Sequence, residues 1–153
     1  MSKTIALAAD HGGYELKEAM KKHLTEKGYA FRDFGTNNGE SVDYPDIAVP
    51  ACSAVLDKQC DLAILFCGTG VGISMAANKI KGIRACCCSD VFSAKYTRIH
   101  NDANALCLGG RVVGAGLACE LADAFLENEF EGGRHALRVA KLTALENEPQ
   151  HKL

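Results

Sequence analysis

Eight cysteines are spread over this 153-residue chain, and one of them stands where a thiol could do chemistry. Cys67 ends the strand predicted from Asp61 to Cys67, which is apolar after Asp61, and a glycine-rich segment, Gly68 to Gly72, follows it directly. At the start of a helix, the positive end of the helix dipole favours the thiolate over the thiol. Such a thiolate could act as a nucleophile or a general base, whereas the other seven cysteines are interpreted as packing thiols.

The spacing of the cysteines excludes two other roles. No two of them lie three residues apart, so the sequence has no zinc ribbon and no thioredoxin-type redox pair. The first apolar run, Ile5 to Ala9, is too short for the core of a secretory leader, and no apolar run reaches the ~20 residues of a membrane span. We therefore expect a cytoplasmic protein with reduced thiols.

A second polar segment, Asp10 to Gly13, follows the apolar run Ile5 to Ala9. In parallel sheets, sites form at the carboxyl ends of strands, where glycines let the backbone approach a ligand and helix N-termini bind anions. The segment Gly68 to Gly72 lacks the third glycine of G-x-G-x-x-G and the Gly-Lys-Ser/Thr ending of a P-loop. By itself it indicates either a generic anion site or a tight turn.

Three arginines could supply a phosphate site. Arg134 and Arg138 are four residues apart, so on a helix they would share a face, where they could converge on a phosphate or pair with Glu131 or Glu146. Arg111 follows another predicted strand at the same functional edge. The net charge of −2, without any basic stretch, argues against nucleic-acid and membrane-surface binding.

Short apolar runs alternate with helix-period segments, which is the pattern of βαβ units around a parallel sheet. Strands are expected at 5–9, 29–34, 61–67, 83–88 and 105–109. Helices are expected at 14–27, 45–58, 71–79, 90–99, 114–128 and 133–148. The chain length fits one domain over residues 1–153, a three-layer α/β/α sandwich with a five-stranded parallel Rossmann-like sheet.

His100 could shuttle protons, although a solvated histidine at a helix end is the common case. The helix predicted at 90–99 runs back to the start of the last strand, so His100 should lie at the amino edge of the sheet. Cys67 should lie at the carboxyl edge. If both act on one substrate, they belong to different subunits, and we expect an active site shared across a dimer interface.

Together these segments resemble the ribose-5-phosphate isomerase B family, which also includes allose-6-phosphate isomerase and the galactose-6-phosphate isomerase subunits. The resemblance runs from residue 4 to about residue 148. The motifs that carry it are Asp10-His11-Gly12-Gly13, Asp43-Tyr44-Pro45, Cys67 to Ser74, Ala77-Asn78-Lys79, His100-Asn101-Asp102, Gly110-Arg111 and Glu131 to His135.

The resemblance implies an aldose–ketose isomerase of the pentose phosphate pathway that needs no metal or cofactor and forms a homodimer, or a dimer of such dimers. Cys67 would move a proton between C1 and C2 through an enediolate, and His100 would assist opening of the furanose ring. Thr69 and the loop N–H groups would stabilise the enediolate charge, and the helix at 133–148 would lie at the subunit interface. The remaining substrate contacts implied are Asp10, His11, Tyr44, Gly68, Gly70, Val71, Gly72, Asn101, Arg111, Arg134 and Arg138.

Two alternatives stay open. The chain could isomerise a six-carbon sugar phosphate, allose 6-phosphate or galactose 6-phosphate, because pocket size decides this and the sequence does not give it. A flavodoxin-like nucleotide-binding module, or a receiver module phosphorylated on Asp10, comes from another class. Such a module would not need Cys67, His100 and the arginines together.

Overall fold

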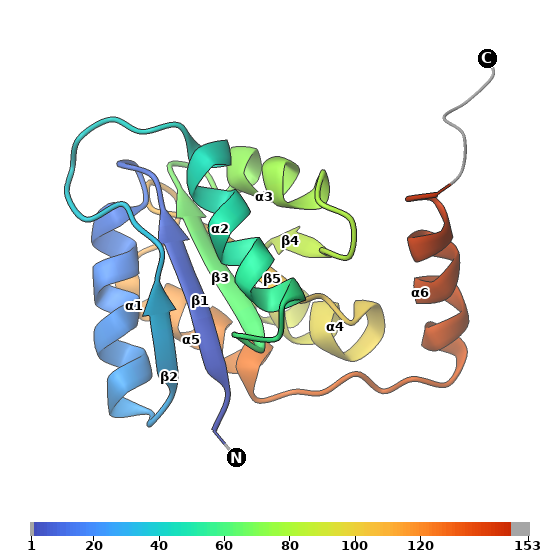
Figure 1. Ribbon diagram of the computed structural model, residues 1–153. Coiled ribbons are helices and arrows are strands. Elements are labelled where there is room, and N and C mark those ends of the chain that lie inside the picture. Colours follow the sequence, from blue (N-terminus) through green and yellow to red (C-terminus); the bar gives the residue numbers. More distant parts are fainter. Residues whose placement is uncertain (1, 148–153) are drawn as a thin grey trace.

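The computed structural model describes residues 2–147 and places a parallel sheet between two layers of helices (Figure 1). The strands run in the order β2-β1-β3-β5-β4, and every neighbouring pair is parallel. Their bounds are β1 (Thr4–Ala9), β2 (Ala30–Asp33), β3 (Leu62–Cys67), β4 (Ala85–Cys87) and β5 (Ala105–Gly109). The predicted fold class is confirmed.

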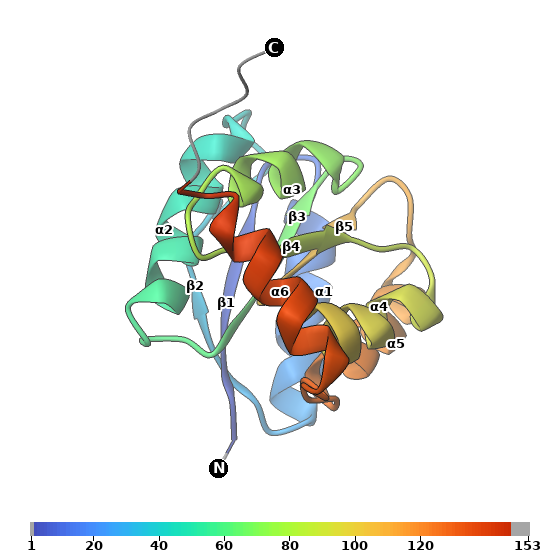
Figure 2. The ribbon, with the colours of Figure 1, turned by 90° about the vertical axis from the view of Figure 1, so that its right-hand side faces the viewer.

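The helices divide between the two faces of the sheet. Those whose buried residues join the core of one face are α1 (Tyr14–Glu26), α4 (Val91–Asn101) and α5 (Ala115–Leu126). Those on the opposite face are α2 (Tyr44–Leu56) and α3 (Val71–Asn78). The last helix, α6 (Arg134–Ala144), stands outside these layers and contacts α4 (Figure 2). It is shorter than the helix predicted at 133–148, and residue 148 lies outside the described part of the chain.

Local sequence explains the main elements. All six residues of β3 are buried, as expected for an unbroken apolar run covered on both faces. On α4, the Asp90 side chain caps the first turn by accepting the Ser93 N–H at 2.7 Å. Three strands, β2, β3 and β4, begin later than predicted, and in β2 and β4 the expected first residues close turns. The Tyr29 N–H donates to the Leu24 carbonyl, and the Ile83 N–H donates to the Ile80 carbonyl.

The register of the sheet sets what lies at its edges. Cys67, the last residue of β3, pairs with Gly109, the last residue of β5, and Ala9 at the end of β1 pairs with Phe66. The segments that follow β1, β3 and β5 therefore leave the sheet at one carboxyl edge. Among the described helices, none is long and apolar enough to cross a membrane.

Candidate active site

The turns after β1 and β3 lie against each other at the carboxyl edge. The Asp10 N–H donates to the Phe66 carbonyl at 3.1 Å. A Cβ atom added to Gly12 would lie only 3.0 Å from the Gly68 Cα, so the two turns pack backbone against backbone. The two segments therefore lie in contact with each other at this edge of the sheet.

Cys67 is 4% exposed, and its Sγ accepts a hydrogen bond from the Gly70 N–H at 3.1 Å. Gly70 has φ of +80°, a left-handed conformation that glycine adopts at little cost, and α3 begins at the next residue. An N–H group aimed at the sulfur favours the negative charge of a thiolate. Cys67 thus occupies the predicted position before a helix N-terminus.

Several groups that can donate hydrogen bonds follow this thiol in the chain. Thr69 is exposed, and its Oγ1 accepts the Val71 N–H at 3.2 Å. Within residues 2–147, the N–H groups of Gly72 and Ile73 in the first turn of α3 have no acceptor. Such first-turn N–H groups are suited to an anionic oxygen.

Asp10 and His11 begin the neighbouring turn. Asp10 is buried, and its Oδ1 accepts hydrogen bonds from the N–H groups of Gly12 and Gly13 at 2.9 and 3.1 Å. The exposed His11 accepts the Val42 N–H at Nδ1, 3.3 Å away. In the neutral ring this assigns the proton to Nε2, which can then donate to a ligand hydroxyl.

Tyr44 and Arg111 close in on the glycine loop from other elements. A Cβ atom on Gly72 would lie 2.8 Å from the Tyr44 Cζ, and one on Gly68 would lie 3.0 Å from the Arg111 Nη1. The guanidinium fork of Arg111 matches the oxygens of a phosphate. The structure therefore brings together these predicted residues: Asp10, His11, Tyr44, Cys67, Gly68, Thr69, Gly70, Val71, Gly72 and Arg111.

The remaining predicted residues lie elsewhere. His100 and Asn101 end α4, shortly before β5 begins at Ala105, whereas Cys67 pairs with Gly109 at the far end of β5. These two edges are ~13 Å apart along the strand. Arg134 and Arg138 are exposed on α6, which contacts α4, the helix that carries His100.

His135 received no role from the sequence, yet it connects α6 to this group. Its ring stacks on that of His100, with centroids 4.1 Å apart and planes at 14°. Burial lowers the pKa of His135, and the charges of His100 and Arg134 lower it further. The signal available in the sequence was its place in the Glu131 to His135 motif.

His100, Glu131 and His135 are the described side chains that could hold a metal, since one ligand atom from each lies within 4.8 Å of the others. The two ring planes are nearly parallel, so their nitrogen lone pairs run side by side and do not converge on one ion. Arg134 and Arg138 also place positive charge beside His135. This arrangement suits an anionic ligand better than a cation.

The interpretation of seven cysteines as packing thiols is wrong for Cys87, which is exposed. Its Sγ lies 3.6 Å from the Thr69 carbonyl, to which the thiol can donate. Cys87 pairs with Cys107, two residues before the partner of Cys67, so the three side chains share a face of the sheet. Sequence reasoning missed this because the position depends on strand order.

Comparison with known proteins agrees with this geometry. The family described as Ribose/Galactose Isomerase matches residues 5–142. Ribose-5-phosphate isomerase B of Escherichia coli (strain K12) is 49% identical over 144 residues, covering 94% of this chain and 97% of the relative. D-erythrulose-4-phosphate isomerase of Pectobacterium atrosepticum is 39% identical over 150 residues, covering 97% and 99%. The solved structure of Clostridium thermocellum ribose-5-phosphate isomerase B has a TM-score of 0.93 at 50% identity, covering 94% and 97%. The chain belongs to the ribose/galactose isomerase family.

Proposed function

We propose that this chain interconverts ribose 5-phosphate and ribulose 5-phosphate. The observation that carries the proposal is the environment of Cys67, a buried thiol that accepts a hydrogen bond from the Gly70 N–H. The loop after it leads into the first turn of α3, where the Gly72 and Ile73 N–H groups have no acceptor among residues 2–147. Removal of a proton next to a carbonyl needs a positioned base and stabilisation of the enediolate charge. The Cys67 thiol and the N–H groups of the loop that follows it can supply both, and the relative of 49% identity carries the name ribose-5-phosphate isomerase B.

In the proposed reaction, the Cys67 thiolate takes the proton from C2 of the open-chain aldose, which leaves an enediolate and a neutral thiol. The thiol then returns that proton to C1, while a hydroxyl proton moves from O2 to O1 and the ketose forms. Thr69 and the loop N–H groups stabilise the charged oxygen. Since the Gly70 and Val71 N–H groups are bonded within the loop, Gly72 is the predicted donor that is free for this purpose.

In this proposal, a second copy of the chain supplies the residue that assists ring opening and the α6 arginines that bind the phosphate. His100, Asn101, Arg134 and Arg138 lie at the opposite edge from Cys67 in one chain, as the register of β5 requires. A homodimer that places these residues of the partner subunit against Cys67 completes the site. The phosphate then lies between Arg111 and the arginines of the partner's α6.

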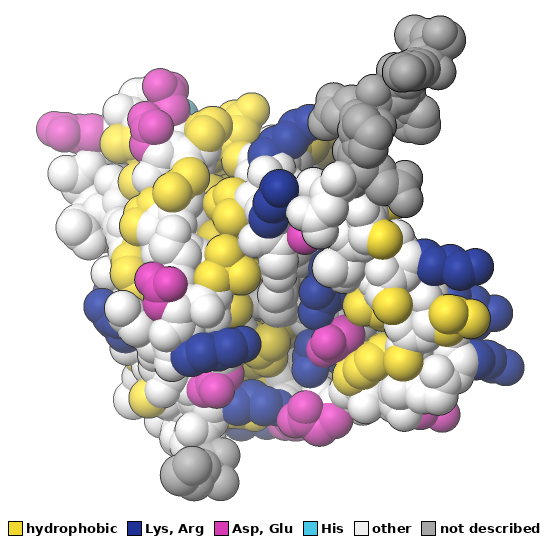
Figure 3. Space-filling view, turned by 45° about the vertical axis from the view of Figure 1, so that its right-hand side comes forward, with side chains coloured by type: hydrophobic (Ala, Val, Ile, Leu, Met, Phe, Trp, Pro, Cys, Tyr) yellow, Lys and Arg dark blue, Asp and Glu magenta, His cyan; other side chains and the backbone are white. Residues whose placement is uncertain are grey.

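Exposed apolar side chains support this assembly. On α3, Val71 and Met75 are 45% and 61% exposed. On α6, Leu137 is 62% exposed, and Leu145, directly after this helix, is also 62% exposed. A cavity of about 650 Å³ between α6 and the body of the molecule is lined by Asn101 and Leu145, among others. Figure 3 shows this hollow beside α6. If α3 of a second copy enters it, the apolar faces are covered and the two halves of the site meet.

The function is tested by measuring ketose formation from ribose 5-phosphate with the wild type and with Cys67→Ala. We expect Cys67→Ala to fold and to lose at least ~10²-fold in kcat, the lower end for removal of a general base. Cys119→Ala is the matched control, because this thiol lies on α5, away from the loop. Activity of Cys67→Ala close to that of the wild type would refute the proposed base.

Parallel assays with allose 6-phosphate, galactose 6-phosphate and erythrulose 4-phosphate determine the substrate. We expect the highest kcat/KM for ribose 5-phosphate, and a higher value for another sugar would replace it as the substrate. If the protein isomerises none of these sugars and instead becomes phosphorylated on Asp10, the receiver alternative is supported. Binding of a nucleotide without isomerase activity would support the flavodoxin-like alternative.

Subunit complementation tests the shared site. Each heterodimer of a Cys67→Ala chain and a His100→Asn chain would contain one site with both wild-type residues and one with neither. Random exchange of two inactive variants should then restore about a quarter of wild-type activity, because half of the dimers are mixed and each has one working site. If both residues acted within one chain, mixing would restore nothing.

A further inference from the structure

Lys17 is a buried charge that the proposed chemistry does not use. It lies in α1, and its side chain is 0% exposed, although lysine is almost never fully buried unless its charge is paired. Its Nζ donates to the Asp33 Oδ1 and to the Thr36 carbonyl, both at 2.6 Å. The ammonium thus joins α1 to the segment that follows β2.

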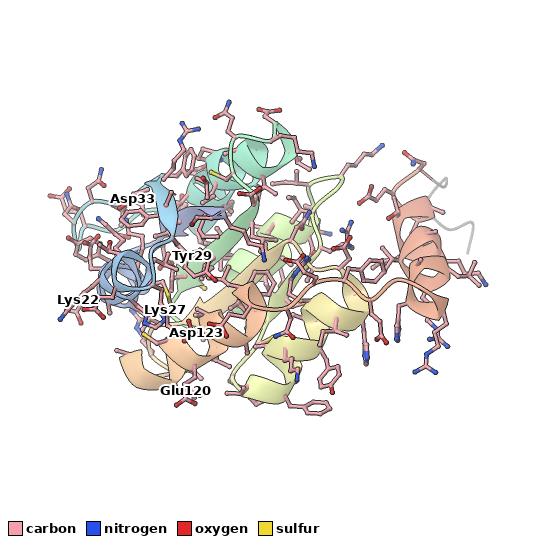
Figure 4. All side chains as sticks on the ribbon, turned by 90° about the horizontal axis from the view of Figure 1, so that it is seen from below. Lys22, Lys27, Tyr29, Asp33, Glu120 and Asp123 are labelled. Atoms are coloured by element: carbon pink, nitrogen blue, oxygen red, sulfur yellow. The ribbon has the colours of Figure 1, made fainter. Side chains whose placement is uncertain are left out.

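The Asp33 carboxylate is held in its charged form. Burial raises the pKa of Asp33, but hydrogen bonds from Lys17, the Gly35 N–H and Lys21 together lower it to below its ordinary value. Figure 4 shows Asp33 at the end of β2, beside α1. The ion pair with Lys17 therefore persists at neutral pH.

The segment held by Lys17 is bonded in turn to the end of β1. The Thr36 N–H donates to the Ala9 carbonyl at 2.6 Å, and the Ala9 N–H donates to the Gly35 carbonyl at 2.7 Å. Ala9 directly precedes Asp10, which begins the candidate sugar-binding turn. One buried ammonium therefore stands two hydrogen bonds away from the backbone that carries Asp10.

The same segment leads to two other candidate substrate residues. After Thr36 the chain passes over the turn that contains His11, where the Val42 N–H donates to the His11 Nδ1. It then enters α2 at Tyr44, whose ring lies on the glycine loop at Gly72. A displacement of residues 35–36 would therefore shift both the contact with His11 and the position of Tyr44.

We propose that Lys17 is a positioning residue, which fixes the Thr36 carbonyl and thereby sets Asp10, His11 and Tyr44 for the sugar. This inference rests on the proposed isomerase function. Without the ammonium, the buried Thr36 carbonyl loses its partner and the segment shifts to regain a hydrogen bond. Because the affected residues contact the sugar and not the reacting C–H bond, the effect falls on binding.

The test compares Lys17→Met with Lys21→Met. Lys21 is a matched control, since it lies one turn further along α1 and binds the other oxygen of Asp33 at 3.0 Å without a hydrogen bond to Thr36. We expect KM for ribose 5-phosphate to rise about tenfold or more in Lys17→Met, with a smaller fall in kcat, and to stay within about twofold in Lys21→Met. A merely structural role would lower the melting temperature and the active fraction while KM stayed unchanged.

A second variant keeps the inference testable if Lys17→Met does not fold. Lys17→Met/Asp33→Asn removes both charges and leaves no unpaired carboxylate, and we expect the same rise in KM. A wild-type KM in either folded variant overturns the inference.

Amide hydrogen exchange supplies a readout independent of activity. We expect faster exchange of the Thr36 and Val42 N–H groups in the folded Lys17 variant, but not in Lys21→Met, with β3 unchanged. Unchanged exchange at both positions also overturns the inference. If exchange differs between the variants as expected but the wild type isomerises no sugar phosphate, the proposed function is refuted instead.

Discussion

Gly70→Ala is the most direct test of how the loop equips Cys67. Gly70 has φ of +80°, and an added Cβ would lie 2.9 Å from the Cys87 Sγ, 2.9 Å from the Leu108 carbonyl carbon and 3.1 Å from the Gly109 N. Two of these three atoms belong to the backbone of β5 and cannot rotate away. The loop must therefore move, and with it the N–H group that Cys67 receives.

Two costs add in this variant. A non-glycine residue in the left-handed region costs about 1–2 kcal/mol, and crowding in a packed site typically costs about 1–3 kcal/mol. We expect the free energy of unfolding to fall by about 2–5 kcal/mol. Displacement of the loop N–H groups from the sulfur and from the oxyanion should lower kcat by ~10²–10³, as for loss of one oxyanion donor.

The assay measures kcat for ribose 5-phosphate on folded protein, together with thermal unfolding. Gly116→Ala is the control, because Gly116 lies in α5 and a Cβ added there meets nothing within 4 Å. Alanine in a helix should stabilise that variant by about 0.5–1 kcal/mol and leave kcat unchanged. A folded Gly70→Ala protein with wild-type kcat would show that the loop backbone does not serve Cys67.

Two further predictions concern the residues that sequence reasoning missed. Because burial, and then the charges of His100 and Arg134, lower the pKa of His135, the folded chain binds fewer protons than the unfolded one. The contribution of neutral His135 to stability is therefore complete above pH 6.5, its ordinary pKa, and is lost as pH falls through the lowered pKa. In His135→Phe, the free energy of unfolding should depend less on pH in this range. For Cys87→Ala, loss of the contact with the Thr69 carbonyl should lower kcat by about two- to tenfold. An unchanged kcat would show that this thiol has only a packing role.

Much of the fold follows from local sequence. The unbroken apolar run of β3 indicated a central strand, and its end at Cys67 before a glycine segment gave the first half of the site. The direction of α4 before β5 placed His100 at the opposite edge without any structure. These inferences succeed because the alternation of strands and helices leaves one handedness and one functional edge.

The sequence could not place side chains that meet across long separations. Lys17 reads as a solvated residue of an amphipathic helix, and only the fold shows it buried against the Asp33 carboxylate and the Thr36 carbonyl. Likewise, Cys87 reaches the loop because β4 lies beside β5, a strand order that local patterns do not specify. Packing between distant segments decides both cases.

The two halves of the proposed site are held very differently, and this bears on the substrate. Cys67 and its donors are fixed by the sheet and by two packed turns, whereas α6 is attached through the stack of His135 on His100 and a few other contacts with α4. In the proposed dimer, the distance from Cys67 to the arginines of the partner's α6 is set by the subunit interface. That distance determines how many carbon atoms fit between the reacting centre and the phosphate. In this proposal, chains with the same catalytic motif can differ in the length of the sugar that they accept, because the loop carries out the reaction while Arg111 and the subunit interface position the phosphate.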